Sequence, residues 1–403
     1  MKFTIVALVG TSALALAGVA AFAQPRAGGT TTYWMTAETS SGMAAMSAGA
    51  GNPAAMAAAM MGRRGAARES YVRNLNLQLG AGRRPAGEPN AEHLPPAGLQ
   101  AGPSLPLLTP RPQSVPTVTP NQWQSGMERP RGRMLIYWGC GESARPGQPV
   151  IIDFATLTSG RVPPAFANST FKPMMPPSPA TSSTYGHWPN ERSQTRIPAA
   201  GSLVGPHVVR GNYTPDINFT LAPDQDFLAP VTLTSNSASP SGSVPLVWRP
   251  VPGARAWLAS TMGAGANGDF IMWSSSEMQM AAMAVDYLPD GEIARLLQQR
   301  VLMPASADRC TVPAQVARAA PQSMLNLVAL GSEANFSHPV RPARAPASWK
   351  PEWTVKLRTK STHMSMLGMS MEQMMGETGD GEQAQPQKKK NKLRRGLGKI
   401  LGQ

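Results

Sequence analysis

The sequence predicts an all-β protein with two β-sandwich-like lobes, one short helix, a flexible N-terminal segment and a flexible C-terminal tail. Short apolar runs, rich in β-branched and aromatic residues, recur between clusters of turn-forming residues at spacings of about 8–15 residues. Gly and Pro number 38 and 40 among 403 residues, which suits a loop-rich chain. One segment, residues 290–302, stands out for helical periodicity.

Residues 1–23 have the three parts of a secretory signal peptide. Lys2 supplies the positive start, Ile5–Ala20 the apolar middle, and Ala21–Ala23 a cleavage site of small-x-small type. The apolar stretch is also long enough for an uncleaved membrane anchor, which is the alternative. We expect cleavage and export, and therefore a periplasmic or extracellular protein.

Residues 24–70 form an Ala-, Gly- and Met-rich segment that we expect to be flexible, with one short strand candidate at Thr30–Met35. Gly and Pro interrupt the helix-favouring Ala and Met and confine any helix to Ala54–Met61. A first β-rich lobe with Pro-rich loops is expected over residues 71–200. It begins with Tyr71–Leu79, where leucines alternate with polar residues at the period of a strand.

The stretch Arg133–Leu157 is the densest in residues that can specify a fold. Two apolar runs flank a Gly- and Pro-rich connection there, which predicts paired strands. This stretch contains Cys140, and the only other cysteine is Cys310. After export an even cysteine count favours a disulfide between them, and two buried free thiols are the alternative.

The second lobe, residues 201–361, contains a series of strand candidates separated by turn-forming residues. They lie at 208–210, 216–221, 231–235, 245–248, 256–262, 270–274, 324–330 and 353–359. The helix over residues 290–302 starts at Asp290, a side chain suited to capping, and places its apolar residues on one face.

Residues 244–262 place Trp248 at the end of one apolar run, Pro252 and Gly253 in a turn, and Trp257 in the next run. This pattern resembles the adjacent B and C strands of fibronectin type III modules. The resemblance covers 19 of the 403 residues and implies a sandwich-type scaffold without implying an activity. As a whole, the chain resembles uncharacterised exported bacterial proteins.

The stretch 363–375 holds six methionines and one histidine. Thioether sulfur and imidazole nitrogen are ligands that suit copper, the thioether Cu(I) in particular. The candidate copper ligands are His363, Met364, Met366, Met369 and Met371. In a strand, two methionines that lie two residues apart share a face. Methionine also packs as an adaptable apolar residue, and that interpretation stays open.

Residues 362–403 combine this stretch with a basic tail. The net charge is +14, and the last sixteen residues carry seven basic residues and no acidic one. As a helix, the tail presents one apolar stripe surrounded by cations, which favours binding to an anionic membrane surface. A solvated, disordered tail is the alternative. The candidate surface-binding residues are Lys392, Leu393, Arg394, Arg395, Leu397, Lys399, Ile400 and Leu401.

The sequence contains no nucleophile elbow, no phosphate-binding Gly loop and no carboxylate pair that would nominate an enzyme. Trp188, in a Pro-flanked loop, is the candidate for an exposed aromatic residue that contacts a ligand.

We therefore expect a non-enzymatic envelope protein without a cofactor, acting as a scaffold or binding module. Its expected partners are an anionic membrane surface or a cell-wall polymer, with another envelope protein as a further class and nucleic acid disfavoured by the compartment. The alternative is a periplasmic copper-binding protein that uses residues 363–375.

Overall fold

The computed structural model describes residues 29–48, 71–110, 132–154, 172–193, 195–279 and 288–369. Strands dominate this part of the chain and form three sheets, which confirms the all-β prediction. The longest helix within it is α4 (Asp290–Gln298), and two one-turn to two-turn helices, α1 (Met43–Ala48) and α5 (Ala314–Ala319), accompany it.

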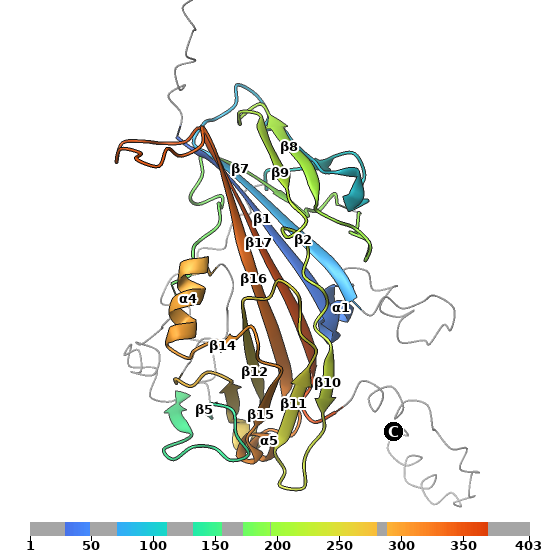
Figure 1. Ribbon diagram of the computed structural model, residues 1–403, viewed down its shortest axis with the longest axis vertical. Coiled ribbons are helices and arrows are strands. Elements are labelled where there is room, and N and C mark those ends of the chain that lie inside the picture. The colour runs from blue at the N-terminus through green and yellow to red at the C-terminus, as the bar shows by residue number, and fades with distance from the viewer. Residues whose placement is uncertain are drawn as a thin grey trace, which may run out of the picture.

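Ten strands form one long sheet that runs along the longest axis of the molecule (Figure 1). Its order is β6 (Val150–Asp153), β5 (Arg133–Trp138), β13 (Phe270–Ser274), β12 (Ala256–Ala264), β16 (Met324–His338), β17 (Trp353–Met366), β1 (Thr31–Gly42), β2 (Tyr71–Ala81) and β7 (Thr184–Trp188), with β14 (Met303–Pro304) paired to β12. The central strands are the longest, and at about 3.3 Å per residue β16 extends for about 50 Å.

Two smaller sheets cover one face of the long sheet, which we call the inner face. The first has four strands, β4 (Leu105–Pro106), β3 (Ala91–Leu94), β8 (Gly205–Gly211) and β9 (Ile217–Leu221). The second has three, β10 (Leu233–Asn236), β11 (Val244–Trp248) and β15 (Arg309–Val312). The two predicted sandwich-like lobes are therefore present, and both use the same long sheet as one of their layers.

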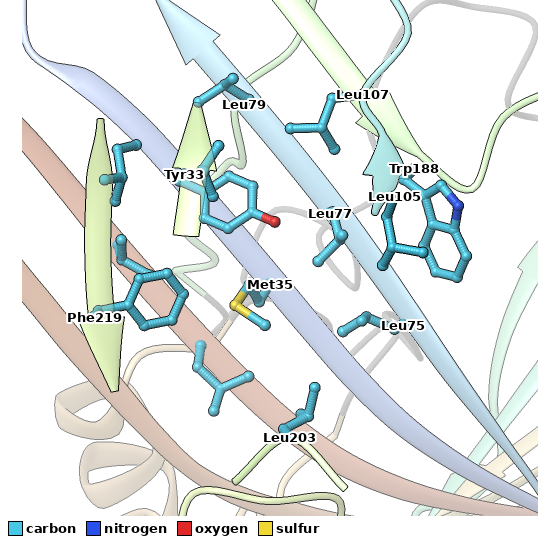
Figure 2. Packing of buried hydrophobic residues seen from close by; sticks show 14 of the residues in the cluster. Tyr33, Met35, Leu75, Leu77, Leu79, Leu105, Leu107, Trp188, Leu203 and Phe219 are labelled. Carbon is cyan, nitrogen blue, oxygen red and sulfur yellow. The ribbon is translucent and has the colours of Figure 1, made fainter. Parts of the chain in front are cut away.

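Each lobe has its own apolar core between the long sheet and a small sheet. In the first, alternate residues of β1 and β2 pack under the four-stranded sheet, among them Tyr33, Met35 and Leu77 (Figure 2). In the second, Trp248 of β11 packs against Trp257 of β12, with ring centroids 5.4 Å apart. The predicted turn at Pro252 and Gly253 joins these two strands, and the chain crosses from one layer to the other there.

A polar seam separates the two cores on the inner face. Thr39 and Ser41 of β1 donate hydrogen bonds to the carbonyl oxygens of Leu228 and Val231, at 2.7 and 2.8 Å. Ser361 of β17 accepts a hydrogen bond from the backbone N–H of Val231 at 3.1 Å. The connection between the small sheets is thereby tied to the middle of the long sheet.

The opposite, outer face carries α4, which lies to the left of the long sheet in Figure 1. Ile293 and Leu296 of the helix pack on Leu258, Val328 and Leu330 of the sheet. The predicted helix is confirmed, but its capping by Asp290 is wrong. The Asp290 carboxylate instead accepts a hydrogen bond from the backbone N–H of Glu333 in β16, at 3.2 Å, and so fixes the helix to the sheet.

The long sheet does not respect the predicted segment boundaries at residues 70, 200 and 361. β1 contains most of the predicted strand Thr30–Met35 but continues to Gly42, through residues expected to be flexible, and it pairs with β17 on one side and β2 on the other. The long sheet takes strands from both predicted lobes, and β17 continues past residue 361 to Met366. Thr39 and Ser41 hide the second half of β1 in the sequence, because these inner-face residues form hydrogen bonds where apolar residues would otherwise mark the core.

Candidate functional site

A groove of about 810 Å³ opens on the outer face, at the end of the long sheet where β16 ends and β17 begins. Strands β1, β2, β16 and β17 line it, together with residues 174–182 and the loop 339–352 between β16 and β17. Four chain segments that are far apart in the sequence therefore form the groove. The loop between β16 and β17, which borders it, lies at the top of the sheet in Figure 1.

Apolar side chains provide most of the lining. Met174 and Met175 are 39% and 77% exposed, and Trp349 is half-buried; Phe336 also borders the groove, but its ring packs in the first core against Phe219. Trp34 of β1 also borders the groove but is only 4% exposed, so its ring supports the floor more than it contacts solvent. The exposed methionines and the partly exposed Trp349 are the apolar surface available to a ligand.

Two cations border the groove, and only one of them is already neutralised by a carboxylate that the structure describes. The Lys356 Nζ lies 2.8 Å from a carboxylate oxygen of Glu333 and 2.7 Å from the amide oxygen of Asn335. Burial acts to raise the pKa of Glu333, but hydrogen bonds from Lys356 and Asn335 outweigh it and hold that pKa below its usual value. Arg341 is exposed, and its guanidinium lies over the Trp349 ring, 5.7 Å from the centroid.

Hydroxyl and amide groups complete the lining, among them Thr32, Thr354, Ser337 and Asn335. The described lining side chains that carry charge are thus Lys356 and Arg341, both of them cations. This combination of apolar surface, hydroxyls and cations is suited to binding, since it offers apolar contact, hydrogen bonds and charge.

The described members of the predicted copper site, His363, Met364, Met366 and Met369, do not converge on one point. His363 lies on the inner face, where its Nδ1 is 3.0 Å from the Ser41 hydroxyl and burial lowers its pKa to about 4. Met364 and Met366 follow His363 in β17 by one and three residues. Because successive strand residues point to opposite faces, both methionines lie on the outer face. The backbone at Met369 turns back and its carbonyl oxygen accepts a hydrogen bond from Asn236 of β10, at 3.0 Å. Met371 lies outside the described residues.

Trp188 is not an exposed aromatic residue. Its side chain is 4% exposed and packs in the first core with Leu77, Leu105 and Leu107 (Figure 2). The reason is that β7 pairs with β2 as part of the long sheet, and Trp188 lies directly opposite Leu77 on the inner face. The prediction that Trp188 contacts a ligand is corrected accordingly.

The predicted disulfide between Cys140 and Cys310 is present, with Cα atoms 5.3 Å apart. Cys140 follows β5 near one edge of the long sheet, and Cys310 lies in β15 of the three-stranded sheet. A backbone hydrogen bond from Gly141 to Thr311, 2.9 Å long, runs beside it. The bridge therefore joins the two layers of the second lobe.

Sequence reasoning missed a buried chain of hydrogen bonds in the first core. The Tyr33 hydroxyl lies 2.8 Å from His93 Nδ1, His93 Nε2 lies 3.1 Å from His207 Nδ1, and His207 Nε2 lies 2.7 Å from the Leu203 carbonyl oxygen. Because a carbonyl only accepts, His207 carries its proton on Nε2, His93 donates to His207, and Tyr33 donates to His93.

Every group in this chain is satisfied only when both imidazoles are neutral. Burial lowers the pKa of His207 to about 4, and burial together with the neighbouring His207 lowers the pKa of His93 well below its usual value. The two histidines are 114 residues apart, so no local spacing in the sequence could have revealed the pair. The arrangement is a structural link between β1, β3 and β8.

The predicted signal peptide, residues 1–23, and the surface-binding tail from Lys392 to Leu401 lie outside the described residues and stay predictions. Within the described part of the chain, no helix combines the length and the apolar character needed to cross a membrane. Comparison with known proteins finds no matching family model, no matching curated protein and no matching solved structure. The resemblance of residues 244–262 to fibronectin type III strands likewise stays a prediction.

Proposed function

We propose that the protein is an exported, non-enzymatic binding module of the cell envelope, and that its groove holds an acidic glycan such as a cell-wall polymer. The observation that carries the proposal is that Trp349 and Arg341 lie together, beside hydroxyl and amide groups, in one open groove. An acidic polysaccharide has a partner for each of these groups: apolar sugar faces for the ring, hydroxyls for the hydroxyl and amide groups, and an acid group for the guanidinium.

The apolar surface suits the faces of sugar rings, which carry C–H groups. A partly exposed tryptophan ring offers a rigid apolar contact at low cost in conformational entropy, and Trp349 has this exposure. The hydroxyls of Thr32, Ser337 and Thr354 can donate to and accept from sugar hydroxyls.

Charge supports an acidic rather than a neutral glycan. Lys356 is already paired with Glu333, whereas Arg341 is exposed and positioned over Trp349. A guanidinium binds a carboxylate or phosphate through two parallel hydrogen bonds, so Arg341 is the group that selects for the anion.

The first experiment measures binding of the full chain, without its signal peptide, to a uronic-acid polysaccharide, with a neutral glucan as the comparison. Trp349→Ala should weaken binding to both polymers by about fivefold or more, since loss of an aromatic anchor costs at least about 1 kcal/mol. Arg341→Gln should weaken binding to the acidic polymer and leave binding to the neutral glucan unchanged. Arg344→Gln, at an exposed position in the same loop, is the matched control and should bind both polymers like the unmodified protein. If both groove variants bind like the unmodified protein, the groove is not the site.

A second experiment tests how the module is held at the envelope. Removing residues 388–403 deletes the seven basic residues of the tail. We expect the truncated protein to leave the membrane fraction and to retain polysaccharide binding, because the groove lies in another part of the chain. Unchanged fractionation would show that the tail is not the anchor.

A further inference from the structure

Four methionines lie in register across four neighbouring strands of the long sheet. Met272 of β13 is directly opposite Met262 of β12, Met262 is opposite Met324 of β16, and Met324 is opposite Met366 of β17. We call these four residues the methionine row. Directly opposite residues of antiparallel strands point to the same face, with Cβ atoms about 4.5–5.5 Å apart. Neighbouring thioethers of the row are therefore within reach of one another.

The methionine row lies on the outer face. The residues next to it in each strand, such as Trp273 and Leu325, belong to the core under the three-stranded sheet, so the methionines point the other way. Met272 is 6% exposed and Met262 is 41% exposed, while Met324 and Met366 are half-buried. The row thus has a closed end and an open side through which a small ion can enter.

Polar atoms without partners lie beside the methionine row. The next positions along the same strands are Ser274, Ser260, Asn326 and Met364, which are again directly opposite one another. The Ser274 hydroxyl and the Asn326 side-chain oxygen are buried and have no hydrogen-bond partner among the described residues. These two unpartnered oxygens lie one same-face strand position away from the sulfur atoms, so the surface beside the row is polar as well as apolar.

The composition of the row differs from that of the neighbouring packing surfaces. Under α4 the same face carries Leu258, Val328 and Leu330, and the inner face carries aliphatic and aromatic side chains. β-branched and aromatic residues fit a sheet surface better than the unbranched methionine does. None of the four methionines belongs to the cluster that packs under α4, and the polar pair Ser260 and Asn326 separates them from it, so packing under the helix does not account for them.

We propose that the methionine row is a binding site for a soft monovalent cation, Cu(I), with thioether sulfur atoms as its ligands. Thioether ligands select Cu(I), whereas Ca²⁺ and Mg²⁺ require oxygen ligands that the four methionines do not supply. A thioether has no proton to lose on binding, so affinity at this site is independent of pH, unlike that of an imidazole or thiolate site.

This site is distinct from the ligand set that the sequence suggests over residues 363–375. It shares Met366 with that set and has Met364 beside it, but its other members come from β12, β13 and β16. His363 lies on the opposite face of β17, and the backbone at Met369 is tied to Asn236. The site also lies away from the proposed glycan groove, none of whose lining residues belongs to the row.

The test is an anaerobic titration of the full chain with Cu(I) against a chromophoric Cu(I) chelator, without thiols, which would reduce the disulfide. We expect one Cu(I) per chain, with a Kd on the order of micromolar or tighter and equal values near neutral and near acidic pH. The triple variant Met262→Leu, Met324→Leu, Met366→Leu should bind at least about 10-fold more weakly, since even changes outside the ligand shell cost 10- to 100-fold. Leucine conserves volume, and circular dichroism checks that the variant folds.

Two controls separate this site from the alternatives. His363→Gln and Met369→Leu should leave Cu(I) affinity unchanged, because neither residue belongs to the row. With methyl-labelled methionine, Ag(I) as a redox-inert substitute should shift the signals of the row in the unmodified protein and leave those of Met174 and Met175 in place. No uptake, unchanged affinity in the triple variant, or loss of affinity in His363→Gln would overturn the proposal.

Discussion

Replacing His207 by glutamine should flatten the dependence of protein stability on pH. In the folded protein His207 is neutral, because it donates to the Leu203 carbonyl oxygen, accepts from His93, and stacks on Phe219 with ring centroids 5.0 Å apart. Burial lowers the pKa of His207 from 6.5 to about 4. Between these two values the unfolded chain binds more protons than the folded one, so the free energy of unfolding falls as the pH is lowered through this window and is fully retained above it.

The size of the effect follows from the two pKa values. A fall from 6.5 to about 4 corresponds to about 3 kcal/mol when the window is crossed completely, at 1.36 kcal/mol per pKa unit. Between about pH 7 and about pH 4.5 the contribution of His207 is about 2 kcal/mol. Glutamine does not titrate and can still donate to Leu203, but it loses the imidazole acceptor for His93. We therefore expect the variant to be less stable near neutral pH by about 1–2 kcal/mol.

The assay is urea denaturation of the unmodified protein and of His207→Gln, each near pH 7 and near pH 4.5. The fall in the free energy of unfolding between about pH 7 and about pH 4.5 should be smaller in the variant by about 2 kcal/mol, although the variant is already less stable near pH 7. His338→Gln, at an exposed position, controls for the exchange of histidine for glutamine as such. An equal acid-induced loss in the unmodified protein and in His207→Gln would falsify the assignment of a neutral, buried His207.

Two further predictions concern stability. Cys140→Ala with Cys310→Ala should lower the free energy of unfolding by about 2–5 kcal/mol, as urea denaturation would measure, because the bridge closes a long loop; an unchanged midpoint would contradict this. Glu333→Gln should lower the free energy of unfolding by about 1–3 kcal/mol, because it leaves the largely buried Lys356 ammonium without its carboxylate partner. Adding Lys356→Met to Glu333→Gln should recover part of this loss in the same assay, and a further loss would mean that the ion pair is not the cause.

The sequence predicted those strands whose inner face is apolar along their length. Tyr71–Leu79 corresponds to β2, because Leu75, Leu77 and Leu79 all enter the first core. β17 was predicted only as far as Thr359, since its inner-face residues beyond that point include Ser361 and His363, which form hydrogen bonds. A period of two in hydrophobicity marks a core, and it disappears where a sheet buries hydroxyls instead.

Which strands pair with one another could not be predicted from the sequence in this way. β1 lies beside β17, more than 300 residues away in the sequence, and no local pattern indicates that neighbour. The disulfide was predictable because only Cys140 and Cys310 were available. The groove was not predicted, since β1, β2, β16, β17 and two loops meet to form it.

The metal prediction shows both the use and the limit of local spacing. Alternation along a strand correctly places Met364 and Met366 on one face, and the same alternation removes His363 from that face. The partners of Met366 come from other strands, where Met324 is an isolated methionine in an otherwise ordinary apolar run. Only the register of the sheet reveals that they form a row.

The place of β17 has a consequence for how the chain reaches its final state. β17 pairs with β16 on one side and with β1 on the other, and it is the link between the two halves of the long sheet. A nascent chain that has not yet delivered this strand has two long edges with open hydrogen-bonding groups, which are prone to pair with other molecules. Assembly of the sheet is therefore a late event, and a chain arrested before residue 353 would be a candidate for aggregation or for binding by a chaperone.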